Sequence, residues 1–260
     1  MAYSTILVQK GGHITRIVLN CPSVGNVINV QMGQELEDAC REANQDEDVH
    51  VVVISGAGDV FCAGSELEHS FQARTKRPTP EEMGTQYNVA SALAAIGKPV
   101  IAAVNGDALG QGMELALACD IRCAVSTARL GFPNVALGIL PMDGGTQRLP
   151  RLIGKGKALE LIMSAETISA TEAEQIGLVS KVVAPSALDA EVDALAKSMA
   201  GKAPIALRYI KEAVNKGLDL TLEQGLRLEA DLYFLLHTTV DRTEGIKAFL
   251  EKRPPEFKGK

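Results

Sequence analysis

The sequence predicts an α/β fold that is followed by a helical region used in oligomerisation. Short apolar, often β-branched segments alternate with segments of helical spacing in the first half of the chain, and the links between them are short. After Gly154 the pattern becomes mainly helical. Such alternation favours parallel strands joined by right-handed helical crossovers. We therefore expect a core over residues 1–200 and a C-terminal helical region over residues 201–260.

The first half of the chain contains several strands and helices that can be placed from the pattern. The expected strands are residues 14–19, 49–54, 100–104 and 121–125, and most end at a turn signal. The expected helices are residues 32–43, 81–96 and 111–119. The second strand is apolar at nearly every position, which is typical of a parallel strand whose two faces are both covered.

The C-terminal part carries recognisable helix start signals. Ser169 with Glu172 and Thr221 with Gln224 match the capping-box pattern. Pro204 follows a chain break and suits the first turn of a helix. Two apolar stripes then follow, one at Leu207, Ile210 and Val214 and one at Leu222, Leu226, Ala230 and Tyr233. These faces pack either on the core or on another subunit, and the pattern alone leaves both readings open.

Composition excludes several classes of protein. The net charge is -6, from 26 basic and 32 acidic residues, and there is no strong basic run, so nucleic-acid binding is not expected. The longest aliphatic runs, such as Val100–Val104, are far shorter than the roughly 20 residues of a membrane span. The first four residues have neither a charged leader nor an apolar signal core. The 5 cysteines lack metal-binding spacing, so we expect a reducing cytoplasm without disulfides or zinc.

Two glycine-containing turns are candidates for chemistry. Residues 105–116 form a strand end, a glycine-rich turn and a helix start, where backbone N–H groups lack helical partners and can stabilise negative charge. This turn has neither the lysine nor the third glycine of nucleotide-binding loops. Residues 61–67 form a second turn of small residues. Either turn can also be a packed tight turn, and Cys62 is a poor candidate nucleophile because only His69 lies nearby in sequence.

These segments, taken together, resemble the crotonase family, which is the enoyl-CoA hydratase/isomerase superfamily. The matching segments are Asn20–Pro22, Phe61–Leu67, Lys98–Gly106, Gly110–Ala116 with Cys119 and Asp120, Leu137–Pro141, Gly144–Leu149 and Phe249–Arg253. They occur in the family's order and spacing over essentially the whole chain. The resemblance implies a spiral of ββα units, an acyl-CoA thioester substrate, no cofactor, and assembly as a homotrimer or a dimer of trimers.

The resemblance also implies how the substrate is held. Two backbone N–H groups bind the thioester oxygen, and by position they belong to Ala63 and Gln111. The family commonly has glycine at position 111, so the Gln111 side chain is expected to shape the acyl pocket. The implied CoA contacts are Ala63, Gly64, Ser65, Glu66 and Leu67 through the backbone, with Tyr233 and Lys252 from the tail, partly across a subunit boundary.

The implied acid–base residues depart from the usual pair of glutamates. Glu114 matches the glutamate that activates water. The second acid position holds Asn134, and an amide holds water or a carbonyl but does not exchange protons near neutral pH. Asp143 is a second acid in a loop where the family usually has small residues. It either caps a helix that opens with Gly144 or takes part in catalysis.

Three functions are compatible with these residues. The favoured one is a lyase that hydrates or dehydrates an unsaturated acyl-CoA through Glu114. The second is a decarboxylase or thioester hydrolase, and decarboxylation needs the oxyanion site but no second base to form the enolate. The third is a non-catalytic acyl-CoA-binding protein or scaffold, and the glutamate beside an intact glycine turn speaks against it.

Overall fold

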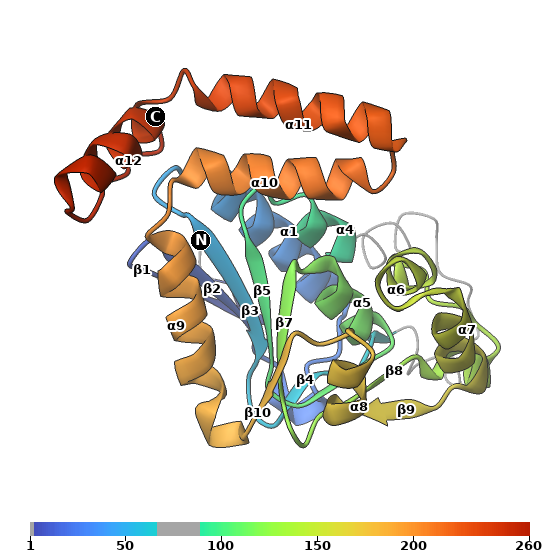
Figure 1. Cartoon of the computed structure of the whole chain (residues 1–260). Coiled ribbons are helices and arrows are strands. Elements are labelled where there is room, and N and C mark those ends of the chain that lie inside the picture. The colour runs from blue at the N-terminus through green and yellow to red at the C-terminus, as the bar shows by residue number, and fades with distance from the viewer. Residues whose placement is uncertain (1–2, 67–88) are drawn as a thin grey trace.

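The computed structural model describes residues 3–66 and 89–260, and within them the chain forms two β-sheets surrounded by helices (Figure 1). The larger sheet has six strands in the order β1-β2-β3-β5-β7-β10. Their bounds are β1 (Ile6–Gly11), β2 (Ile14–Leu19), β3 (Val51–Gly56), β5 (Val100–Val104), β7 (Ile121–Val125) and β10 (Lys181–Val183). Only β1 runs antiparallel to its neighbour, and the other neighbouring pairs are parallel.

Burial explains why these strands could be predicted. All five residues of β5 and the first four of β3 are buried, because the sheet is covered on both faces. The predicted strands at 14–19, 100–104 and 121–125 are confirmed at the same bounds. The strand predicted at 49–54 begins two residues later, at Val51, and ends at Gly56.

The smaller sheet was not predicted, because its strands are too short to show a period. It pairs β4 (Val60–Cys62), β6 (Asp107–Leu109), β8 (Arg129–Gly131) and β9 (Thr167–Ser169) in that order. Strands β4, β6 and β8 follow β3, β5 and β7 directly in the chain. The segment β5–β6–α5 is therefore a ββα unit, and pairing of the second strands sets the turns that follow β4 and β6 side by side.

Helices cover the larger sheet on both faces. The helices α1 (Val30–Gln45), α4 (Val89–Ala94) and α5 (Gln111–Ala118) pack against one another in that order. On the other face, α9 (Leu188–Ala200) contacts β3, β5 and β7 (Figure 1). All eight residues of α5 are buried, so its first turn lies inside the protein rather than in solvent. The predicted helix at 81–96 is described only from Val89 onward.

Three of the remaining helices, α8 (Ala170–Gln175), α10 (Pro204–Gly217) and α11 (Leu222–Leu236), begin at the predicted start signals. The others are α6 (Gly145–Ile153), α7 (Lys155–Ser164) and α12 (Val240–Glu251), with short 3-10 turns η1 (Pro22–Val24), η2 (Pro133–Leu137) and η3 (Pro185–Ala187). Pro204 begins α10, and Thr221 and Gln224 form a reciprocal capping box at α11. Ser169 caps α8 through its hydroxyl.

The last three helices leave large apolar side chains exposed in the single chain. Leu222 is 80% exposed and Phe249 is 83% exposed. Helix α10 has no buried residue, and α11 and α12 lie at one end of the molecule (Figure 1). In the part of the chain that the structure describes, no helix is both long and apolar enough to cross a membrane.

Candidate active site

The two glycine turns meet because β4 and β6 are parallel neighbours. Cys62 is the last residue of β4, and Leu109 is the last residue of β6, so both turns leave the same edge of the smaller sheet. A side chain at Gly112 would overlap the backbone carbonyl of Cys62. Glycine is therefore required at this point, and the close approach joins the start of α5 to the turn that begins at Ala63.

The turn after β4 is fixed by backbone hydrogen bonds to the segment at residues 25–28. Ala63 N–H donates to the Gly25 carbonyl at 2.9 Å. This bond contradicts the prediction that the Ala63 N–H belongs to an oxyanion hole, because that N–H is aimed at the protein's own backbone. Ile28 N–H donates to Gly64 O at 2.9 Å, and Glu66 N–H donates to Ile28 O at 2.8 Å, in a parallel bridge between Ile28 and Ser65. In such a bridge the N–H and carbonyl of Ser65 point away from Ile28.

Gln111 opens α5 and is fully buried. Its backbone N–H belongs to the first helical turn, whose N–H groups lack partners within the helix. Its side chain turns toward Asp143, and Nε2 donates to the Asp143 Oδ2 at 3.1 Å. From the sequence we expect this side chain to shape the acyl pocket, but the sequence does not predict this partner, which lies 32 residues further along the chain.

Glu114 lies on the same turn of α5 and is 1% exposed. Its Oε1 accepts hydrogen bonds from Asp143 N–H at 2.8 Å and from Gly145 N–H at 2.7 Å. A methyl group at Gly145 would lie 3.0 Å from this Oε1 and 2.7 Å from the Phe132 ring. The start of α6 therefore fits closely around the carboxylate and fixes its orientation.

Asp143 is a second buried carboxyl group beside Glu114 and is also 1% exposed. Its Oδ2 accepts from Ala90 N–H at 2.7 Å as well as from Gln111. Burial raises the pKa of Asp143 to about 6, against the lowering effect of these hydrogen bonds. The side chain does not cap α6, whose N-cap is Gly144 without a side-chain bond, so the alternative prediction of a helix cap there is wrong.

Asn134 lies in η2 and is buried. Its backbone carbonyl accepts hydrogen bonds from Gly138 N–H and from Ile139 N–H, the latter at 3.2 Å. Two residues earlier, Phe132 reaches Gly145 and so borders the Glu114 carboxylate. The structure thus joins Gln111, Glu114 and Asp143 by direct hydrogen bonds, and Phe132 brings the segment that carries Asn134 next to them.

The predicted CoA contacts form two separate groups in one chain. The backbone of Ala63–Glu66 lies at the end of β4, whereas Tyr233 on α11 and Lys252 after α12 lie at the opposite end of the molecule (Figure 1). Tyr233 is mostly exposed, with its ring centroid 4.9 Å from that of His237. Leu67 and His69 lie outside the described residues.

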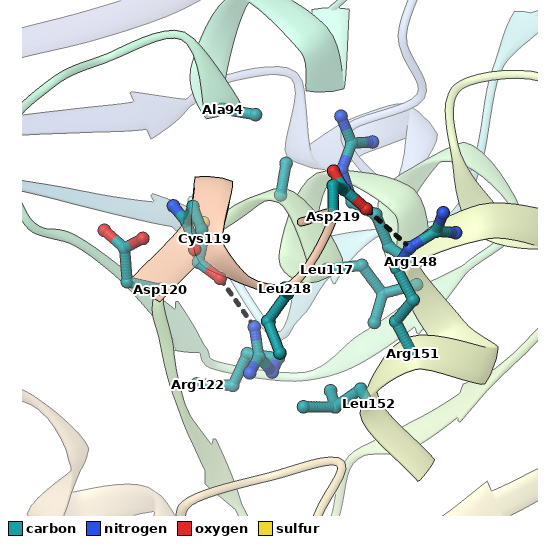
Figure 2. Close-up of a pocket in the computed structure, with 12 residues that line it drawn as sticks. Ala94, Leu117, Cys119, Asp120, Arg122, Arg148, Arg151, Leu152, Leu218 and Asp219 are labelled. Carbon is teal, nitrogen blue, oxygen red and sulfur yellow. Dashed lines mark hydrogen bonds and ion pairs between the residues drawn. The ribbon is translucent and has the colours of Figure 1, made fainter. Parts of the chain in front are cut away.

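A pocket of about 400 Å³ lies at the other end of α5 and is lined by several arginines (Figure 2). Arg122 donates to the carbonyls of Ala116 and Cys119 at 3.2 and 2.6 Å, and to that of Leu178 at 2.7 Å. It therefore satisfies carbonyls at the C-terminus of α5, which is a structural role. Arg148 reaches from this pocket toward the site, and its Nη1 donates to the Asp143 carbonyl at 2.7 Å.

The cysteines offer no competing chemistry. Burial raises the pKa of both Cys40 and Cys119 to about 12, so these thiols stay protonated and unreactive. Cys62 is buried, and its Sγ lies 3.4 Å from the Gly64 carbonyl. Over residues 3–66 and 89–260, no group of three or more histidine, cysteine or acidic side chains is placed to hold a metal ion.

Comparison with known proteins agrees with this geometry. The family model for enoyl-CoA hydratase/isomerase matches residues 9–260. A crotonyl-CoA hydratase of Syntrophomonas wolfei is 42% identical over 259 residues, which are 99% of each chain. A 2,3-dehydroadipyl-CoA hydratase of Escherichia coli is 41% identical over 261 residues, which are 99% of this chain and 100% of that one.

Solved structures give the same result. An enoyl-CoA hydratase from Bacillus anthracis has a TM-score of 0.95 at 39% identity, and the match covers 99% of this chain and 100% of that one. The fold is therefore the crotonase fold, as the resemblance implied. The chain belongs to the enoyl-CoA hydratase/isomerase family and is an enzyme of that type.

Proposed function

We propose that this enzyme adds water to the double bond of an enoyl-CoA thioester and catalyses the reverse dehydration. The observation that carries the proposal is the Glu114 carboxylate, which is buried within one helical turn of the Gln111 N–H and held by two backbone N–H groups. A carboxylate with this orientation can take a proton from water at a bound thioester. The full-length relatives that are named hydratases support the same reaction.

The oxyanion site is proposed to use the N–H groups of Gln111 and Ser65. Both come from turns at the same edge of the smaller sheet, and the contact between Gly112 and Cys62 holds the turns together. Ser65 replaces the predicted Ala63 as donor, because the bridge to Ile28 turns the Ser65 N–H in the opposite direction. One well-placed donor of this kind contributes about 10²–10³ in rate.

The reaction then follows from the charges that develop. Glu114 takes a proton from water while the water oxygen bonds to Cβ, and the electrons of the double bond move onto the thioester as an enolate. The two N–H groups stabilise the negative oxygen. Asn134 holds water or a substrate carbonyl through its amide rather than exchanging a proton. Transfer of a proton to Cα completes the addition.

Assembly and CoA binding are proposed to depend on each other. The exposed apolar side chains on α10, α11 and α12 need a cover, and we assign it to other copies of the chain in a homotrimer or dimer of trimers. In that assembly Tyr233 and Lys252 of one subunit reach the CoA bound by the Ala63–Glu66 turn of another. Lys252 then contributes a mobile point charge to a phosphate.

A reducing compartment such as the cytoplasm is the proposed location. In this structure no two cysteines are joined by a disulfide, and most of the cysteines are buried in the core. No acid–base role in the proposed reaction falls to a cysteine. The thiols are therefore treated as packing groups, which suits a compartment that keeps them reduced.

A second reaction class is favoured by one observation, the amide at position 134. A decarboxylase forms the enolate by loss of CO₂ without a second base, and a thioester hydrolase forms no enolate, so Asn134 is no obstacle to either. A single experiment separates the alternatives. The enzyme is incubated with enoyl-, dienoyl-, hydroxyacyl- and malonyl-type CoA esters, and mass spectrometry distinguishes gain of water, loss of water, loss of CO₂ and release of free CoA.

We expect gain of water by an enoyl-CoA and loss of water by the matching 3-hydroxyacyl-CoA. Both reactions should disappear together in Glu114→Gln, because the same carboxylate serves both directions. Loss of CO₂ or release of CoA, without any hydration, would replace the hydratase proposal with the second class.

A further inference from the structure

The backbone of Asp143 is held by hydrogen bonds through both its N–H and its carbonyl. Its N–H donates to Glu114 Oε1 at 2.8 Å, and its carbonyl accepts from Arg148 Nη1 at 2.7 Å. The next residue, Gly144, has φ +104, and a side chain there would overlap the Arg148 guanidinium. The backbone at Asp143 is thus fixed before any substrate arrives, with Arg148 reaching it from the pocket of Figure 2.

The carboxyl group itself is only partly satisfied. Its Oδ2 accepts from Ala90 N–H and from Gln111 Nε2. Its Oδ1 is buried and makes no hydrogen bond of good geometry among residues 3–66 and 89–260, although the Ser91 N–H also faces the carboxyl and lowers its pKa. Burying an oxygen without a partner is unfavourable. An asparagine could accept the same two bonds without a buried negative charge, so the link between α4 and α5 does not explain why this residue is an acid.

We propose that Asp143 is the second acid–base residue of the hydratase, exchanging the Cα proton that Asn134 does not, and that the Gln111 side chain positions it. This inference rests on the proposed hydration reaction. It places the second acid in the loop before α6. This is nine positions after Asn134, which occupies the position where the resemblance implies an acid. Gln111 then has two functions, because its N–H binds the thioester oxygen and its side chain holds the acid.

The protons balance with these two residues. As hydration starts, Glu114 is ionised and Asp143 is protonated. Glu114 receives one proton of the water while the hydroxyl oxygen bonds to Cβ, and Asp143 then gives its proton to Cα as the enolate collapses. The proton on Glu114 returns to Asp143, directly or through solvent, and the net change is H and OH added across the double bond.

The surroundings of Asp143 give this pair a defined pH dependence. Burial raises the pKa of Asp143 to about 6. Among the residues that the structure describes, the charged side chains bonded to its backbone are Glu114 on α5 and Arg148 on α6. The described part of α4 offers only apolar and serine side chains. Hydration and dehydration both need the pair with one proton, so kcat/KM in both directions should fall tenfold per pH unit above about pH 6.

The test measures Cα chemistry separately from water addition. Butyryl-CoA has no double bond, so deuterium incorporation at its Cα in D₂O reports proton exchange alone, while crotonyl-CoA reports hydration. Asp143→Asn should lower both rates by about 10²–10⁴ and abolish the alkaline fall of kcat/KM. Glu114→Gln should abolish hydration but keep most of the Cα exchange.

A positioning role for Gln111 has its own readout. Gln111→Met keeps the backbone N–H and the size of the side chain but removes the donor to Asp143. Loss of that donor raises the pKa of Asp143, so the alkaline fall should move to higher pH, with a lower kcat and little change in KM. The matched control is Asp120→Asn, whose carboxylate also accepts a backbone N–H at 2.7 Å, from Val100, and a side-chain N–H, from Lys211. It should leave the pH profile unchanged.

Three results would overturn the assignment. One is Cα exchange in Asp143→Asn within threefold of the parent enzyme, in protein whose circular dichroism is unchanged. Another is a wild-type kcat/KM that stays flat from pH 5 to 9, which needs no variant. The third is the same pH profile in Gln111→Met as in the parent. Failure of the hydratase proposal looks different, because the parent enzyme would then not hydrate any ester although the exchange assay still tests Asp143.

Discussion

Asp143→Asn is expected to stabilise the folded protein at neutral and alkaline pH. The pKa of this carboxyl rises from an ordinary 3.8 to about 6 on folding, chiefly because burial disfavours the charge. Each pKa unit corresponds to about 1.36 kcal/mol. The ionised side chain therefore destabilises the folded state by about 3 kcal/mol once the pH is well above 6.

The sign follows from proton binding. Between about pH 4 and pH 6 the folded state keeps a proton that the unfolded state has released, so the free energy of unfolding falls as the pH rises through this window. Below the window both states are protonated, and above it both are ionised, so the contribution is constant on either side. Asparagine has no proton to lose and still accepts hydrogen bonds from Ala90 and Gln111. Its contribution to the free energy of unfolding therefore does not change with pH.

The assay is urea unfolding at a fixed protein concentration, for the parent and the variant, at pH 4 and at pH 8. The free energy of unfolding of the variant minus that of the parent should be about 3 kcal/mol larger at pH 8 than at pH 4. Asp120→Asn is the matched control, and it should lose stability at pH 8 because its carboxylate is paired with Lys211 at 2.8 Å. The reasoning is refuted if Asp143→Asn is destabilised at pH 8 as much as the control.

Four further predictions concern the site and the assembly. Glu114→Gln should keep CoA binding, measured by calorimetry, but lower turnover by about 10²–10⁴ because the base is lost. Gly145→Ala places a methyl group 3.0 Å from Glu114 Oε1, so turnover should fall at least tenfold while circular dichroism stays near that of the parent. Asn134→Glu should lower turnover of the native substrate, since it adds an unpaired buried charge; improved turnover of every enoyl-CoA tested would contradict this. Light scattering at micromolar concentration should show trimers or larger assemblies, and a monomer would contradict the role given to α10–α12.

The sequence predicted the fold where elements were long enough to show a period. The buried strand β5 and the amphipathic helix α1 have many positions that agree with one pattern. The smaller sheet was missed because each of its strands has three residues. Its strands pair across long sequence separations, and this pairing brings the two glycine-containing turns together.

The arrangement of the site could be predicted only for residues that are close together in the sequence. Glu114 follows Gln111 by less than one helical turn, so their proximity could be predicted from spacing. The direction of the Ala63 N–H depends on pairing with residues 25–28, and the bond between Gln111 and Asp143 spans 32 residues. Neither of these two contacts produces a periodic or compositional signal in the sequence. A resemblance to a family therefore indicates which positions matter but does not predict these contacts.

The departures at positions 111, 134 and 143 depend on one another through charge and hydrogen bonding. A glycine at 111 would leave the buried Asp143 carboxyl without its side-chain donor. An acid at 134, together with Glu114 and Asp143, would add a third carboxyl to a buried segment that already holds two, and like charges in such a place do not all ionise. An amide at 134 avoids that repulsion, and under the proposal made above the acid at 143 supplies the proton. Each of the three residues is therefore best explained by the presence of the other two.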